Sequence, residues 1–459
     1  MLGMCNNFAY IIMLSSAKDI LSADGNMLPS GNSTIFACEV RESAKRFKSS
    51  VGAVFLFEAI SFSNFFNQMV FFKEVISSRK CSKISTGSVL LADILPALIV
   101  KIFAPFIMNR VPFGMRHLIV VALQATSFML VANSKNVFDA LFGVVLASAG
   151  SGLGEVTYLS LASFYHSYTI TAWSSGTGGA GILGSFIYAL FTDEHMLGFS
   201  PRDALLTMLV VPLIFSFAYW KLLILPPKIH RVYLLNPSTY IVSASSMFFA
   251  NMTIERDHSS DDELAELIED EEREHFSAPV SMLEKFAAAK PLFWFMMPLS
   301  IVYFAEYFIN QGLVELLQFD CSHGFGLSWS TQYKWYQVLY QIGVFISRSS
   351  VECFEIPVKF LKFLPVLQML NAAFFFWDAV KEFIPHVILV FIIIFYEGLL
   401  GGAAYANTFM AIHKLVSPER KEFSMAFVSM SDSFGIVCAG ILAIPVHNFI
   451  CNINNPGSI

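Results

Sequence analysis

The chain has 459 residues, of which 55% are hydrophobic and 14% are charged, and its formal net charge is −6. Soluble domains are typically about 25% charged, so this composition excludes an ordinary cytosolic protein, and no basic patch points to nucleic acid. The hydrophobic residues fall in blocks of about 20, the length that a helix needs to cross a bilayer. We therefore predict an all-α membrane protein that crosses the membrane many times.

Eleven hydrophobic stretches are predicted to span the membrane, six before and five after one long polar stretch. The start has neither a cationic region nor a clear cleavage site, so it is interpreted as the first span and not as a removable signal peptide. The predicted spans are 1–17, 86–108, 115–133, 137–164, 168–192, 203–225, 291–317, 330–350, 357–378, 383–412 and 421–450.

Residues 51–72 are also long enough to span, but polar side chains lie inside this segment and basic clusters flank both of its ends. If it crossed the membrane, every later loop would change sides and the distribution of basic residues would invert. We therefore predict that it lies in the membrane interface or beside the bundle.

The predicted organisation is two helical halves joined by an acidic linker. Basic residues in the short loops favour a cytosolic N-terminus, which places Asn32 of an NST sequon on the opposite side as a glycosylation candidate and the linker in the cytosol. The predicted units are a six-helix half at 1–225 with an atypical insertion at 41–80, the linker at 226–290, a five-helix half at 291–451 and a tail at 452–459.

Two internal matches relate the halves. GTGGAGIL at 176–183 resembles GIVCAGIL at 435–442, and GLGEVTY at 152–158 resembles GLLGGAAY at 398–405. Both matches occur in consecutive spans and in the same order. Transporters are commonly built from such repeats, so we predict a major-facilitator-like bundle of about 11 helices in two pseudo-repeated halves around a central cavity.

The stretch WSSGTGGAG at 173–181 matches the dinucleotide-binding pattern G-x-G-x-x-G. That reading needs a strand before the glycines, whereas here the flanks are apolar helix. Small residues four apart let membrane helices approach closely, and we favour this interpretation, with Ser174, Ser175 and Thr177 placing hydroxyls at the contact. The predicted packing glycines are Gly150, Gly154, Gly176, Gly178, Gly181, Gly184, Gly398 and Gly402.

Ionisable residues inside the predicted spans need an explanation, because each costs about 3 kcal/mol or more at mid-bilayer. One interpretation is that they pair and lock helices together, and Asp93 and Lys101, two turns apart, could be partly interfacial. For the whole set we favour a polar pathway through the bundle. The set is Asp93, Lys101, Glu155, Glu306, Glu315, Arg348, Glu397 and Asp432.

The predicted spans 291–317 and 330–350 carry the richest chemistry. Asn310 follows Glu306 by one helical turn, so the two side chains share a face, with Gln311 at its edge. A stripe of Tyr and Gln follows in the next span, which is typical of plain core but also suits a wet cavity for a polar solute. Arg348 can hold a phosphate or a carboxylate, or brace the cytosolic gate. The stripe consists of Tyr333, Tyr336, Gln337, Tyr340 and Gln341, and Asn407 completes the predicted pathway residues.

Several of these segments resemble the battenin family of lysosomal membrane proteins that is linked to Batten disease. They are MLGMCNNFAYIIMLSSAKDIL, VLLADILPALIVKIFAP, SGLGEVTYLSL, SSGTGGAG, YFAEYFINQGLVELL, YQVLYQIGVFISRSS and YEGLLGGAAYANTF. The resemblance implies a late-endosomal or lysosomal protein, distantly similar to major-facilitator and equilibrative nucleoside transporters. It also implies a link to clearance of glycerophosphodiesters, luminal pH and basic amino acids.

The chain departs from the family's pattern in places. It begins inside the first span, and residues 41–80 and about 228–252 have no counterpart that we identify. The family's C-terminal prenylation box is absent, since eight residues follow Cys451. An acidic dileucine-like sorting signal is retained only approximately, at Leu267 and Ile268.

We predict an alternating-access carrier for a small polar or anionic solute, with no cofactor or metal. Proton coupling would use Glu155, Glu306 or Glu397, and Arg348 or Lys101 would supply the positive charge that an anionic solute needs. Expected partners are the solute, protons, the lipid bilayer and cytosolic sorting adaptors.

Two alternatives were weighed against the carrier. A membrane adaptor or trafficking regulator would act through the acidic segment 255–284. An intramembrane hydrolase or transferase is disfavoured, because no nucleophile lies beside a base in the sequence.

Overall fold

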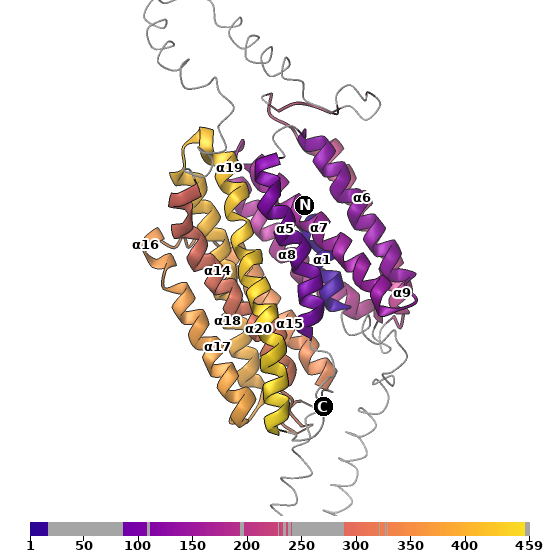
Figure 1. Ribbon diagram of the computed structural model, residues 1–459, viewed down its shortest axis with the longest axis vertical. Helices are drawn as coiled ribbons and strands as arrows, with labels where there is room; N and C mark the ends of the chain where they lie inside the picture. The colour runs from indigo at the N-terminus through magenta and orange to yellow at the C-terminus, as the bar shows by residue number, and fades with distance from the viewer. Residues whose placement is uncertain are drawn as a thin grey trace, which may run out of the picture.

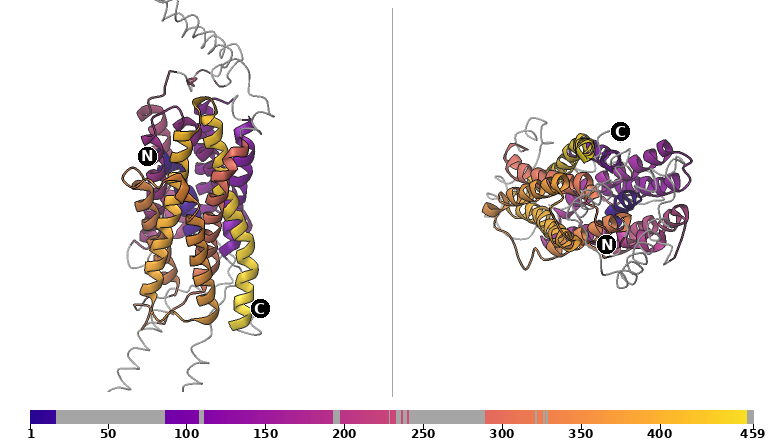
Figure 2. Two further views of the ribbon diagram at one scale, coloured as in Figure 1. Left: turned by 90° about the vertical axis from the view of Figure 1, so that its left-hand side faces the viewer. Right: turned by 90° about the horizontal axis from the view of Figure 1, so that it is seen from below.

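The computed structural model describes residues 1–16, 86–107, 111–192, 197–227, 229–232, 236, 240, 289–320, 322–325, 327 and 329–454. Within these ranges every regular element is helical. The helices form one bundle of two groups that lie side by side (Figure 1), and the end-on view shows the same division (Figure 2). We call the two groups the N-terminal half, residues 1–232, and the C-terminal half, residues 289–454.

The N-terminal half contains five long helices and a sixth, interrupted helical stretch. Local signals mark two helix starts. The Asn136 side chain accepts a hydrogen bond from the Asp139 backbone N–H at 2.8 Å, at the start of the helix Val137–Ala162. Ser200 caps the helix Pro201–Thr207, which begins with a proline. The elements are α1 (Leu2–Ser15), α5 (Thr86–Ile107), α6 (Phe113–Ala132), α7 (Val137–Ala162), α8 (Tyr168–Thr192), α9 (Pro201–Thr207), α10 (Val210–Phe217) and the π-turn η2 (Ala218–Leu222).

The C-terminal half contains five long helices with short connecting elements. Its first long helix is followed directly by a π-turn, which is wider than an α-helix, and then by a 3₁₀ turn, which is tighter. The elements are η4 (Lys290–Leu292), α14 (Phe293–Phe308), the π-turn η5 (Ile309–Leu313), η6 (Val314–Leu316), α15 (Trp329–Ser349), α16 (Val358–Leu361), α17 (Leu364–Lys381), α18 (Val387–Leu415), α19 (Pro418–Val428) and α20 (Met430–Asn454).

The outer surface of the bundle is apolar. Large hydrophobic side chains are exposed all along it, including Phe103, Leu213, Leu370 and Trp377. In contrast, many charged and polar side chains are buried inside. An apolar exterior of this extent fits contact with lipid, and it agrees with an all-helical membrane protein.

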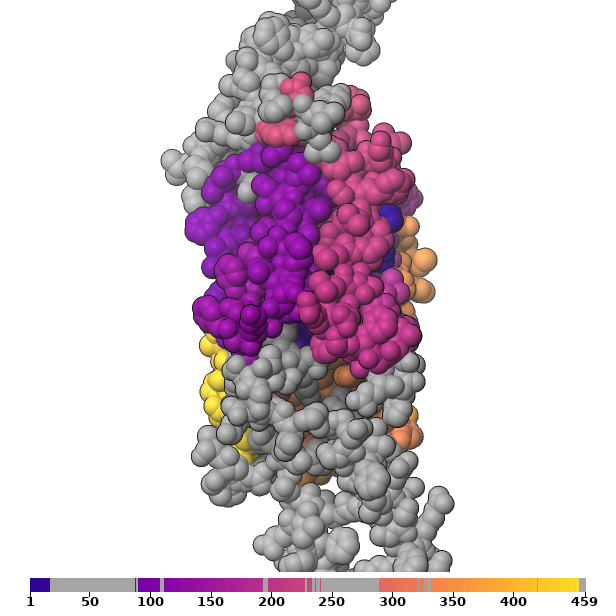
Figure 3. All heavy atoms as spheres, turned by 90° about the vertical axis from the view of Figure 1, so that its right-hand side faces the viewer, coloured from indigo at the N-terminus to yellow at the C-terminus, as the bar shows by residue number. Residues whose placement is uncertain are grey.

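α1 occupies an interior position in the N-terminal half. Nine of its fourteen residues are buried, and it packs against α5, α7, α8 and α10. In the space-filling view of the outer face of this half, the indigo of α1 shows only in small areas (Figure 3). The helix is therefore held by its neighbours and exposes little of itself to lipid.

Equivalent helices of the two halves make equivalent contacts. α8 packs against α1 as α20 packs against α14, and α7 packs against α5 as α18 packs against α15. The two contacts across the interface between the halves are also equivalent: α8 packs against α15, and α20 packs against α5. These are the helices that the two sequence matches relate, so the prediction of two pseudo-repeated halves is confirmed.

Eight described stretches are long and apolar enough to cross a membrane, and all eight coincide with predicted spans. The other three predicted spans are also helical, as α1, α8 and α15. α1 has only 14 residues and falls among the shorter apolar helices. The helical membrane class is thus confirmed, while the count of eleven crossings stays a prediction.

The predicted packing glycines lie at contacts between helices. An added Cβ atom at Gly154, Gly176 or Gly184 would meet α1, and one at Gly150 would meet Leu123 of α6. The remaining four face α15, and these are Gly178, Gly181, Gly398 and Gly402. WSSGTGGAG lies wholly within α8, so its glycines belong to a helix packed against α1 and α15.

Gly398→Ala should lower the thermal unfolding midpoint of the purified protein, because the new methyl group would meet the backbone carbonyl oxygen of Tyr340. Overpacking of this kind typically costs about 1–3 kcal/mol. The matched control is Gly179→Ala, where the nearest atom to an added Cβ is a Phe345 ring carbon at 3.6 Å. The control should keep or slightly raise the midpoint, since Ala favours helix over Gly. Equal midpoints for both variants would contradict the packing role.

Candidate functional site

A central cavity of about 60 Å³ lies where the two halves meet. Seven helices line it: α1, α5 and α7 of the N-terminal half, and α14, α15, α18 and α20 of the C-terminal half. The lining residues are Asn7, Tyr10, Ile94, Ala97, Lys101, Ser151, Gly152, Glu155, Tyr303, Tyr307, Arg348, Tyr405, Asp432, Ser433 and Ile436. Polar side chains from both halves therefore share one enclosed space.

Lys101 joins the two halves through this cavity. Its Nζ atom lies 2.7 Å from Oε2 of Glu155 on α7 and 2.9 Å from Oδ1 of Asp432 on α20. All three side chains are at least nine-tenths buried. One ammonium thus serves two carboxylates, and breaking the contact with Asp432 would leave buried charges less well compensated, which is costly in an apolar surrounding.

Arg348 is the second cation of the cavity, and it is held differently. Its Nη1 atom donates to Oγ1 of Thr177 at 2.5 Å, and Nη2 donates to the Tyr303 hydroxyl at 2.7 Å. The guanidinium also lies over the Tyr405 ring, 4.2 Å from its centroid. Among the described residues no carboxylate lies within 4.0 Å of it, and its Nε atom has no hydrogen-bond partner. Arg348 is therefore a buried cation that is solvated by hydroxyls and a ring and has no carboxylate in direct contact among the described residues.

Tyrosine hydroxyls complete the walls of the cavity. Tyr405 donates to Oε1 of Glu155 at 2.9 Å and accepts a hydrogen bond from Nε1 of Trp173 at 3.2 Å. On the other side, the hydroxyls of Tyr10 and Tyr307 are 3.2 Å apart and join α1 to α14. These groups can donate to or accept from a solute, because each hydroxyl has both functions.

A second polar cluster lies inside the C-terminal half, apart from the cavity lining. Tyr340 donates to Oε1 of Glu306, and Nδ2 of Asn310 donates both to Oε1 of Glu397 at 2.9 Å and to the backbone carbonyl of Glu306 at 3.1 Å. The π-turn η5 places Asn310 in this position. Oε2 of each glutamate has no hydrogen-bond partner, and no cation among the described residues lies within 4.0 Å of either. Such a cluster suits binding of protons and not of anions.

Three hydroxyl residues predicted in α8 lie at its contact with α15. Thr177 binds Arg348, as above, and Oγ of Ser175 lies 2.8 Å from Oγ of Ser349. Ser174 is buried, and its hydroxyl has no hydrogen-bond partner. Of the three, only Thr177 therefore touches a residue that lines the cavity.

The stripe of Tyr and Gln on α15 is not part of the lining of the central cavity, and of its two interpretations the contacts favour the plain core. Tyr336 is fully buried and donates to the Leu317 carbonyl at 3.4 Å, while Nε2 of Gln337 reaches Asn310 at 3.5 Å. Gln341 lies against Gly181 of α8. The stripe faces helices of the bundle and not the cavity, because α15 lies between α8 and α18.

Two more predicted pathway residues also brace the C-terminal half. Gln311 accepts a hydrogen bond from the Tyr333 hydroxyl at 3.1 Å. Oδ1 of Asn407 accepts one from the Ile356 backbone N–H at 2.7 Å, which ties the connection before α16 to α18. Neither residue lines the cavity.

Neither Asp93 nor Lys101 is exposed on the surface of the bundle, and their position relative to the membrane interface stays a prediction. Asp93 is 0% exposed and Lys101 is 2% exposed. Nor do they pair, because residues eight apart in a helix are separated by about 12 Å along its axis. Neither carboxylate oxygen of Asp93 has a hydrogen-bond partner. Glu315, also predicted within a span, lies 2.8 Å from Nδ1 of His447 on α20.

The structure brings together four of the eight predicted ionisable residues: Lys101, Glu155, Arg348 and Asp432. The tyrosines around them were not among the predicted pathway residues, because no contact across spans far apart in sequence can be seen in one chain. A signal did exist for Tyr405 and Tyr307. Tyr405 ends the repeat GLLGGAAY, and Tyr307 stands beside Glu306 in YFAEYF.

Several predictions fall outside the described residues. These are the glycosylation candidate Asn32, the insertion 41–80 with its segment 51–72, the acidic segment 255–284 and the sorting residues Leu267 and Ile268.

Comparison with known proteins gives a family match over nearly the whole chain. Residues 1–453 match the CLN3 protein family. Battenin of Canis lupus familiaris is 41% identical over 455 residues, which cover 99% of this chain and 90% of that protein. Protein BTN1 of Yarrowia lipolytica is 39% identical over 366 residues, covering 79% and 86% of the two chains.

Among solved structures, the chain is similar to the human organic anion transporter MFSD10 (TETRAN), with a TM-score of 0.48 and 12% identity. The match covers 99% of this chain and 97% of that one.

The resemblance that the sequence motifs suggested is thus confirmed by the family match over residues 1–453 and by 41% identity over 99% of this chain. This multi-pass helical membrane protein belongs to the CLN3, or battenin, family.

Proposed function

We propose that this protein is an alternating-access carrier that moves a small anionic organic solute across the late-endosomal or lysosomal membrane. The observation that carries the proposal is Arg348: a buried cation in the wall of a cavity between two halves, with no carboxylate partner among the described residues. A permanently charged guanidinium with a free N–H is a binding group for a carboxylate or a phosphate.

The cavity supports a moving mechanism. At about 60 Å³ it is well below the roughly 300–1,000 Å³ of typical ligand sites. The described conformation therefore leaves little room for a solute, which would fit only when the halves separate. Separation on one side would part the ion pair between Lys101 and Asp432, because they belong to different halves.

The solute class we propose is a glycerophosphodiester. Its single negative charge would sit at Arg348, and its glycerol hydroxyls would hydrogen-bond to the hydroxyls of Tyr303, Tyr405 and Tyr10 around the cavity. The family's link to glycerophosphodiester clearance supports the same choice.

Proton coupling is proposed at the Lys101 site. Glu155 and Asp432 share one ammonium, so the three groups carry a net charge of −1 when both carboxylates are ionised. A buried excess charge is costly, and one proton on either carboxylate removes it. Release of that proton on the opposite side of the membrane would then accompany the conformational change.

Arg348→Gln should lower the rate of transport of an anionic solute by roughly tenfold or more without unfolding the protein. Loss of one buried charged hydrogen-bonding partner costs about 1.5–3 kcal/mol, or roughly a tenfold or greater fall in rate. The measurement is initial uptake of radiolabelled glycerophosphoglycerol into proteoliposomes. The control is Arg202→Gln, which removes an exposed guanidinium that donates to Asn133 and does not line the cavity.

Equal uptake by the two arginine variants would refute Arg348 as the solute site. Two results together would favour the adaptor alternative. The wild-type protein would show no flux, and deletion of residues 255–284 would abolish the protein's function in cells.

Glu155→Gln should uncouple transport from the proton gradient. One carboxylate would remain for Lys101, so the site would be neutral without a proton, and exchange of solute across the vesicle membrane should persist while gradient-driven accumulation is lost. Glu355→Gln is the control, because Glu355 forms an exposed ion pair with Lys414. Gradient-driven accumulation that survives in Glu155→Gln would contradict coupling at this site.

A further inference from the structure

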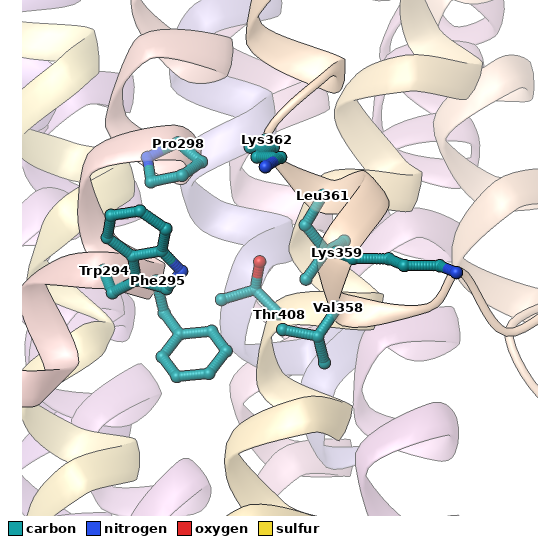
Figure 4. A pocket seen from close by; sticks show the side chains of 8 residues that line it. All are labelled: Trp294, Phe295, Pro298, Val358, Lys359, Leu361, Lys362 and Thr408. Carbon is teal, nitrogen blue, oxygen red and sulfur yellow. The ribbon is translucent and has the colours of Figure 1, made fainter.

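A second, larger cavity of about 330 Å³ opens on the C-terminal half, away from the central site. The side chains around it come from the start of α14, from α16 and the residue after it, and from α18 (Figure 4). They are Trp294, Phe295, Pro298, Val358, Lys359, Leu361, Lys362 and Thr408. Most of this lining is apolar, but three members can bind a polar group.

Thr408 presents an unused hydroxyl to this cavity. The residue is 3% exposed, and its hydroxyl has no hydrogen-bond partner in the described part of the chain. In Figure 4 its oxygen points into the space between the aromatic side chains of α14 and Leu361. The hydroxyl is open to the cavity, so a ligand oxygen there can accept its hydrogen bond.

Lys359 and Lys362 give the cavity a positive edge. They are three residues apart, and both are exposed. Their Nζ atoms lie over the rings of Phe360 and Phe363, at 5.0 and 5.8 Å from the centroids. Neither ammonium lies within 4.0 Å of a carboxylate among the residues that the structure covers. Two ammonium groups without a carboxylate partner among the described residues therefore lie beside the mostly apolar cavity.

The side chains around the cavity are of the kinds that gather at a membrane interface. Trp294 is 72% exposed and lies in the first turn of α14, while Lys359 and Lys362 stand at the helix ends that join α15 to α17. Aromatic and basic side chains gather where the hydrocarbon core meets the headgroups. Thr408 approaches the same end of the bundle from the last two turns of α18.

We infer that this cavity binds an anionic phospholipid of the surrounding bilayer. The phosphate would lie beside Lys359 and Lys362, a phosphate or ester oxygen would accept from Thr408, and the acyl chains would follow Trp294, Phe295 and Val358. The volume falls within the range of small-molecule sites. Basic pockets between membrane helices are known to hold such headgroups.

The lipid site shares two helices with the central cavity. Thr408 lies one turn from Tyr405 on α18, and Pro298 lies just over one turn from Tyr303 on α14. Occupancy of the lipid site would therefore restrain two walls of the central cavity. Lipid binding itself does not depend on the proposed transport, so the two proposals can fail separately.

The test is retention of dioleoyl phosphatidylserine by the full chain, measured by native mass spectrometry after release from nanodiscs of mixed phosphatidylserine and phosphatidylcholine. Lys359→Gln with Lys362→Gln should lower the retained phosphatidylserine by roughly tenfold or more. The matched control, Lys334→Gln with Lys381→Gln, removes two exposed lysines of the same half and should leave retention unchanged.

Two further variants separate specific binding from loss of fold. Lys359→Arg with Lys362→Arg keeps both charges and should retain phosphatidylserine as the wild type does. Thr408→Val keeps the shape but removes the hydroxyl, and retention should fall by roughly fivefold.

Wild-type retention in the Lys359→Gln, Lys362→Gln protein would overturn the inference. So would equal retention of phosphatidylcholine and phosphatidylserine by the wild type, because the cavity would then hold lipid without regard to charge.

Discussion

Charge buried in an apolar surrounding must be compensated, and in this protein the compensation crosses the boundary between the two halves. Lys101 on α5 holds Glu155 of its own half and Asp432 of the other. The cost of leaving either carboxylate uncompensated ties the relative position of the halves to the ionisation of one small site. The central cavity, its tyrosine walls and Arg348 lie around this contact.

The repeat explains why these residues can meet at all. Each half places its first, second, fourth and fifth helices in the same mutual contacts, and the second and fifth helices then form the interface between the halves. Lys101 and Asp432 stand on one such interface pair, α5 and α20, whereas Thr177 and Arg348 stand on the other, α8 and α15. The two contacts therefore join equivalent pairs of helices. The contact of Lys101 with Asp432 is an ion pair, whereas Arg348 donates a hydrogen bond to the hydroxyl of Thr177.

Sequence alone predicted the class of fold and the halves because hydrophobic length and internal similarity are local properties. It also selected Lys101, Glu155, Arg348 and Asp432, since an ionisable group in a hydrophobic stretch is visible without a structure. It failed wherever partners had to be chosen. The partners of Lys101 lie 54 and 331 positions away in the chain, and no local pattern indicates them. The stripe on α15 was likewise visible as a pattern, but which neighbour it faces is decided by packing against α8 and α18.

α18 is a continuous helix of 29 residues, about 44 Å long. This one helix carries Glu397 of the polar cluster inside the C-terminal half, Tyr405 at the central cavity and Thr408 at the second cavity. Its Asn407 binds the chain just before α16. Because the helix is continuous, a tilt at one end moves the side chains at the other end. A substitution near one of these residues can consequently shift the others through the helix, without changing their chemistry.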